Sequence, residues 1–216
     1  MQFPDFKTDE ALKAMAASAV QHSEQVRVVV RDLTLKALET RDLSLDQVGS
    51  VVRSVAEGVN AGAGSNPNMS GTLKQAFSGM DEALLKAVEA NRIALSRMTD
   101  GGARFEDSSI KKALTELERI EDGLIKGIRQ ASGGANAQIR QQWEQMLAAM
   151  PHGQTMTGLG ATSTLEGFAA QMQAQARASR EMGLKAAHMM TQNYATFVTG
   201  VLNGLSEALK QGNKKD

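Results

Sequence analysis

The sequence predicts an all-α protein, a helical bundle of about six helices with a long C-terminal helix. Three observations carry this prediction. Apolar residues recur three or four positions apart through most of the 216 residues, which is the spacing of one helix face. Strict alternation of apolar and polar residues, which marks half-buried strands, is almost absent. The three prolines and most glycine clusters fall between the periodic segments, where they end helices.

The first predicted helix runs from about residue 9, with Thr8 as its N-cap, to about residue 41. The run VRVVV at residues 26–30 has strand propensity, but no turn flanks it, so it is included in the helix. The predicted inward stripe is Leu12, Met15, Ala19, Val26, Val29, Leu33 and Ala37.

The second predicted helix opens at Ser44, with Gln47 at the capping-box spacing, and ends near residue 63. The third spans about residues 70–99 and carries a longer apolar stripe. Its predicted inward positions are Leu73, Phe77, Met80, Leu84, Val88, Leu95 and Met98.

The fourth predicted helix is defined by its apolar stripe, and the fifth contains the single tryptophan. The stripe consists of Ile110, Leu114, Leu117, Ile120, Leu124 and Ile128. The fifth helix covers residues 138–150, where Trp143 is interpreted as a core residue rather than as an exposed anchor for a partner. Together, the five helices form the predicted bundle domain, residues 1–150.

A Gly- and Thr-rich linker is predicted at residues 151–162, followed by a long amphipathic helix at residues 163–211 that Ser163 caps. Residues 186–206 of this helix contain no charged side chain. They would span roughly 30 Å, the thickness of the hydrocarbon core of a bilayer. A polar stripe that includes Thr199 opposes a membrane span, because lipid offers such a stripe few hydrogen-bond partners. We therefore expect no transmembrane span.

The apolar face of this uncharged segment is the candidate interaction face. It consists of Tyr194, Phe197, Val198, Val201, Leu202 and Leu205, which share one side of a helix at about 100° per residue. Three arrangements are open from the sequence: the helix packs on the bundle, pairs with another copy, or lies on an apolar surface.

Two pairs of glycines stand four residues apart, Gly123 with Gly127 and Gly200 with Gly204. A glycine in a helix interior costs about 1 kcal/mol relative to alanine, which makes sense where another backbone comes close. The alternative is that these glycines are tolerated at exposed turns, and the sequence leaves both interpretations open.

No motif for catalysis, cofactor binding or metal binding is found. The chain has no cysteine, and its histidines (His22, His152 and His188) are widely separated. No glutamate has a histidine three residues later, as di-iron sites in helical bundles require. Ser108-x-x-Lys111 has the spacing of serine acyl-transfer enzymes but lacks their companion motifs, so Ser108 is interpreted as a helix cap. The sequence therefore predicts no enzyme, no cofactor and no metal.

The charge and the composition of the chain limit which partners and which cellular compartment we expect. Lys and Arg together number 24, equal to Asp and Glu, so the formal net charge is zero, and aromatic residues are 4% of the chain. Neither the charge nor the aromatic content is typical of a nucleic-acid binder. The N-terminal sequence has acidic residues where a signal peptide needs a basic start, so we expect a cytoplasmic protein of a bacterial cell.

Parts of the sequence resemble two known groups of proteins. VRDLTLKALETRDLSLDQVGSVVRSVAEGVNAGA (30–63) and LKQAFSGMDEALLKAVEA (73–90) resemble an uncharacterised bacterial family of all-helical proteins, over about residues 30–150. This resemblance implies an all-α fold and no known activity. The helix from Phe168 to Leu209 is similar in its Ala- and Gln-rich composition to phasins, which coat polyester storage granules with amphipathic helices.

The expected function is that of a non-enzymatic structural or interaction protein. It would self-associate, or bind a helical partner protein, through the long C-terminal helix. The first alternative is a phasin-like coat protein that adsorbs to an apolar granule or lipid surface. A helical protein that binds a small ligand is the second alternative.

Overall fold

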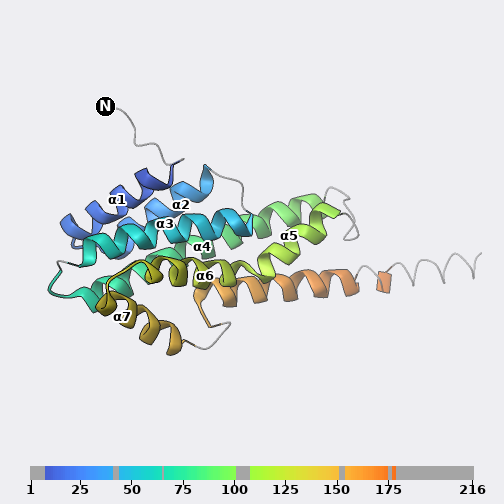
Figure 1. Cartoon of the computed structure of the whole chain (residues 1–216). Helices are drawn as coiled ribbons and strands as arrows, with labels where there is room; N and C mark the ends of the chain where they lie inside the picture. Colours follow the sequence, from blue (N-terminus) through green and yellow to red (C-terminus); the bar gives the residue numbers. More distant parts are fainter. Residues whose placement is uncertain are drawn as a thin grey trace, which may run out of the picture. The chain divides into compact units, whose positions relative to one another are not determined.

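The computed structural model describes residues 8–40, 44–64, 66–100, 108–150, 154–174 and 177–178 (Figure 1). Over these residues the protein is all-α, as predicted, and has no strand. The labelled helices are α1 (Asp9–His22), α2 (Val26–Glu39), α3 (Leu45–Ala63), α4 (Met69–Asp100), α5 (Ser108–Glu118), α6 (Ile120–Gly133) and α7 (Ala137–Ala148). Residues 156–174 are helical as well. The chain divides into two compact units, Met1–Gly167 and Phe168–Asp216.

The prediction of one helix from residue 9 to residue 41 is wrong, because the chain breaks between α1 and α2. Ser23 is extended and ends α1, and its hydroxyl accepts a hydrogen bond from the Gln25 amide at 3.0 Å. Beyond the break, Val26, Leu33 and Ala37 are buried as predicted. Val29 remains 37% exposed, and the neighbouring Val30 is buried in its place.

The fourth predicted helix is also two helices, with Arg119 between α5 and α6. Beyond this break the predicted stripe is correct, since Ile120, Leu124 and Ile128 are all buried. These two breaks explain why the described helices outnumber the six predicted.

The most extensive contacts join α1 to α3, α2 to α4 and α3 to α6 (Figure 1). Glycines make each of these contacts close. A Cβ atom placed on Gly127 of α6 would lie 2.9 Å from the Gly49 carbonyl oxygen of α3. Gly58 of α3 meets the Lys13 carbonyl of α1, and Gly79 of α4 meets the Arg27 carbonyl of α2, in the same way. Of the two interpretations that the sequence leaves open for Gly123 and Gly127, close packing of helix on helix is the one that this contact favours.

α7 is joined to the bundle through its tryptophan. Trp143 is fully buried, which confirms that it is a core residue. Its Nε1 donates to the side-chain oxygen of Asn60 in α3 at 2.7 Å, and the Asn60 amide nitrogen donates to the Ala131 carbonyl in α6 at 3.1 Å. Because a buried polar group is costly without a partner, this chain of bonds fixes α7 against α3 and α6 in one register.

The predicted linker and the predicted domain boundary both need correction. Residues 156–162, assigned to the linker, are helical, and Ser163 lies inside that helix rather than at its cap. The first compact unit continues to Gly167, beyond the predicted end of the bundle at residue 150.

Candidate functional site

Two buried carboxyl groups hold the start of the helix at residues 156–174. Asp81 of α4 is 3% exposed and accepts three hydrogen bonds from the first turn. Its Oδ2 accepts from the Met156 amide at 2.9 Å, and its Oδ1 accepts from the amide of Thr157 at 2.9 Å and from the hydroxyl of Thr157 at 2.6 Å. One acidic side chain of α4 thus satisfies amides that have no partner within their own helix.

Glu121 of α6 completes the contact. Its Oε1 accepts from the Thr155 amide at 3.2 Å and from the Thr155 hydroxyl at 2.6 Å. The same hydroxyl oxygen accepts from the Gly158 amide at 2.9 Å, which makes Thr155 the N-cap of this helix. The helix therefore begins at residue 156, because Thr155 supplies the cap that the sequence analysis assigned to Ser163.

The residues on the inner side of this helix start are small. A Cβ atom placed on Gly158 would lie 2.8 Å from the carboxyl group of Glu121, and one placed on Gly160 would meet the Leu85 side chain of α4. Thr157, Ala161 and Thr164 are buried beside them. Asp81, Glu121, Thr155, Thr157 and Gly158 are called the anchor from here on.

The hydrogen bonds of the anchor attach the helix start to the bundle. Carboxylates at a helix N-terminus are favoured by the partial positive charge of its free amides. Hydrogen bonds to a charged group contribute about 1.5–3 kcal/mol each, more than those between neutral groups. The anchor therefore fixes the first turn of the helix at residues 156–174 to α4 and α6 at once.

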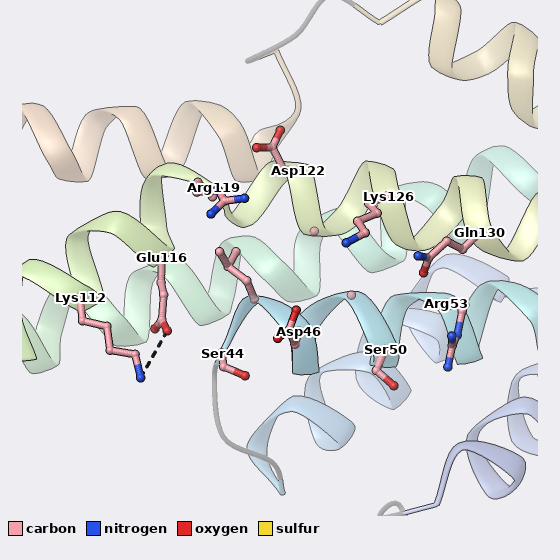
Figure 2. Close-up of a pocket in the computed structure, with 13 residues that line it drawn as sticks. Ser44, Asp46, Ser50, Arg53, Lys112, Glu116, Arg119, Asp122, Lys126 and Gln130 are labelled. Atoms are coloured by element: carbon pink, nitrogen blue, oxygen red, sulfur yellow. Dashed lines mark ion pairs between the residues drawn. The ribbon is translucent and has the colours of Figure 1, made fainter.

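A second feature is a polar furrow of about 530 Å³ between α3 and the α5–α6 pair (Figure 2). Gly49 and Gly123 contribute to its floor, where the two helices approach closely. Its described lining carries four cationic and three anionic side chains: Arg53, Lys112, Arg119, Lys126, Asp46, Glu116 and Asp122. The nearly balanced charge selects neither an anion nor a cation.

The contacts that the described charged side chains of the furrow make also place none of them as a catalytic group. Lys112 and Glu116 form a loose ion pair at 3.9 Å, drawn in Figure 2. Arg53 lies 3.7 Å from Asp9 and 3.9 Å from Glu57. Each of these contacts is typical of a solvated helix surface.

The described residues contain no group of three or more His, Cys, Asp or Glu side chains that could hold a metal ion. Across the same ranges, none of the helices combines the length and the apolar character that a membrane span needs. The predicted interaction face lies outside the described residues: Tyr194, Phe197, Val198, Val201, Leu202 and Leu205.

Comparison with known families matches residues 4–211 to a family of unknown function, DUF6781. The chain belongs to DUF6781. The resemblance to an uncharacterised family is thereby confirmed, and the match covers more of the chain than the expected residues 30–150. No curated protein and no solved structure matches this member of DUF6781.

Sequence reasoning missed the anchor of this DUF6781 member. Asp81 and Glu121 read as ordinary polar positions of amphipathic helices, and their partners lie 76 and 34 residues away along the chain. One signal was available: Thr155 stands directly before the helical stretch, and threonine is a frequent N-cap residue.

Proposed function

We propose that this DUF6781 member is a non-enzymatic interaction protein that self-associates through its C-terminal helix. The single observation that carries the proposal is the anchor. Two buried acidic side chains and a threonine cap fix the first turn of that helix to the bundle. Buried carboxyl groups are costly unless they are fully partnered, so their use here favours a helix start that must be held in place.

The composition of the segment beyond the anchor supports the same function. Residues 186–206 carry no charge, and their apolar positions share one side at helical spacing. An amphipathic helix of this kind is stable in water when its apolar face is covered. A second copy offers such a cover at a fixed stoichiometry, and we place this assembly in the cytoplasm.

The test compares two single substitutions in the full chain. Val201→Asp puts a carboxylate on the apolar face, whereas Thr199→Asp puts the same group about 160° away around the helix. We expect Val201→Asp to raise the dissociation constant of self-association by at least about a hundredfold, because it buries an unpaired charge. Thr199→Asp should change it by less than about threefold.

Sedimentation velocity over a range of concentrations measures both variants against the unaltered chain. If the two variants behave alike, the helix has no distinct apolar face and the proposal fails. If Val201→Asp leaves assembly intact but weakens adsorption to phospholipid vesicles or polyester beads, the coat function replaces the interaction function.

A further inference from the structure

An apolar groove of about 560 Å³ lies between α4 and α7. Leu73 and Phe77 of α4, both nearly buried, form its floor. Met146, Ala149 and Met150 line its other side, and they are half-buried or exposed. Among the described lining residues, Lys74 alone is charged.

The groove exists because α7 faces the bundle with its other side. Ile139 and Trp143 are the buried residues of α7, and they point into the core with the Asn60 hydrogen bond. Gln142, Gln145, Met146 and Ala149 lie about 60–160° away around the helix from Trp143, on the groove side. Methionine walls accommodate varied apolar side chains, as in other grooves that bind helices.

We infer that this groove receives the apolar face of the C-terminal helix from a second copy of the chain. This inference rests on the proposed self-association and names the surface on which the helix docks. Tyr194, Phe197, Val198 and Val201 stand at positions i, i+3, i+4 and i+7, the spacing of the anchoring residues in helix-in-groove complexes.

Charge supports the match between the groove and this segment. Residues 186–206 have no charged side chain, so their docking buries no charge of their own, and the one charged residue of the described lining, Lys74, is exposed and can keep its ammonium group in water. Each copy places its C-terminal segment in the groove of the other copy, so two identical grooves are filled around a two-fold axis. The assembly then closes as a dimer.

The first experiment places a charge in the groove of the full chain. Met146→Lys should raise the dimer dissociation constant by about tenfold or more, measured by sedimentation velocity. Ala148→Lys is the matched control, because it adds the same charge at an exposed position of α7 about 160° away around the helix. It should leave the constant within about twofold.

The second experiment uses the absence of cysteine from the chain. One copy carries Met146→Cys and the other Val201→Cys, and the mixture is oxidised under mild conditions. We expect a covalent dimer between the two different copies. Replacing Met146→Cys by Ala148→Cys should abolish that dimer, and this comparison remains decisive if Met146→Lys fails to fold.

The outcomes separate this inference from the proposed function. If Val201→Asp breaks the dimer while Met146→Lys does not and no crosslink forms, self-association stands and the groove is not its site. If a single chain that carries both Met146→Cys and Val201→Cys crosslinks within itself, and the mixture of the two single variants gives no dimer between copies, the second copy is the wrong occupant. If the unaltered chain sediments as a monomer at every concentration, the proposed function fails, and this inference fails with it.

Discussion

Gly127 shows how a single missing side chain sets the distance between two helices. A Cβ atom at this position of α6 would lie 2.8 Å from the Val52 Cγ1 atom and 2.9 Å from the Gly49 carbonyl oxygen of α3. We predict that Gly127→Ala destabilises the protein by about 1–3 kcal/mol, because a backbone atom cannot move aside as a flexible side chain can. Urea unfolding followed by circular dichroism measures the change.

Gly133 provides the matched control on the same helix. A Cβ atom there would meet nothing within 4 Å, so Gly133→Ala adds helix propensity without a clash. We expect it to leave stability unchanged or to raise it by up to about 1 kcal/mol. Equal destabilisation by both substitutions would contradict the role of Gly127 in the α3–α6 contact.

Lys13 offers a pH-dependent test of the contact between α1 and α3. Its ammonium group lies 2.6 Å from the Glu57 carboxylate, and this hydrogen bond raises the pKa of Lys13 above its usual value of 10.5. A raised pKa stabilises the folded state fully below about pH 10.5, and that contribution is lost as the pH rises through the folded-state pKa. We predict that unaltered protein loses more stability than Glu57→Gln between about pH 9 and about pH 11.5.

Nuclear magnetic resonance of the Lys13 side chain measures the pKa directly. It should fall when Glu57 is replaced by Gln, since the first cause of the shift is removed. Glu89→Gln on α4 serves as the control, and it should leave the Lys13 pKa unchanged. A Lys13 pKa that does not respond to Glu57→Gln would show that the pair is not formed in solution.

At the residue scale, the sequence predicts burial well where the pattern is local. Leu73, Leu84 and Val88 are buried as the apolar stripe of α4 predicts, and Trp143 is in the core. Asp81 and Glu121 could not be predicted, because their burial depends on Thr155 and Thr157, which tertiary folding brings to them. An acidic residue in an amphipathic helix is assigned to the solvated face unless its distant partner is known.

At the element scale, the anchor makes the helix at residues 156–174 dependent on α4. We predict that Asp81→Asn destabilises the protein by about 1–3 kcal/mol, because an amide nitrogen then faces amide donors of the helix start and one of them loses its acceptor. Amide hydrogen exchange at residues 156–160 should accelerate at least about tenfold. Glu89→Gln breaks an exposed ion pair with Lys86 on the same helix, and it should change stability by less than about 0.5 kcal/mol.

Unchanged exchange at residues 156–160 in Asp81→Asn would contradict the anchor. Loss of protection confined to those residues, with the core amides unchanged, would show that the helix start opens independently of the bundle.

Helix existence was predictable from the sequence, but several helix boundaries were not. The break at Ser23 contains neither glycine nor proline, so the pattern QHSEQ gave no stop signal. The start of α3 at Ser44 carries a clear capping signal, and the Ser44 hydroxyl does accept from the Gln47 amide at 3.4 Å. The boundary at Ser44 could be read from its capping-box spacing, whereas the break at Ser23 has no such spacing and no glycine or proline to mark it.

For the whole molecule, most of the buried apolar core lies in the first compact unit, whereas the proposed self-association involves residues beyond it. The buried apolar side chains of the first unit extend from Leu12 to Ala161, and this unit includes the anchor. We predict that a chain shortened to residues 1–178 stays folded, with a melting temperature within about 3 °C of the full chain, and sediments as a monomer.

A chain shortened further, to residues 1–154, tests the anchor at the same scale. It lacks Thr155 and Thr157, so the buried carboxyl groups of Asp81 and Glu121 lose the donors that partner them. Its melting temperature should fall by roughly 5 °C or more, because the hydrogen bonds of the anchor and the buried side chains of Thr157, Ala161 and Thr164 are lost. A monomeric, stable 1–178 chain beside a destabilised 1–154 chain would assign folding to the bundle with its anchor and assembly to the residues that follow. An unfolded 1–178 chain would instead make the C-terminal residues part of the fold itself, and self-association would then have to be sought on another surface.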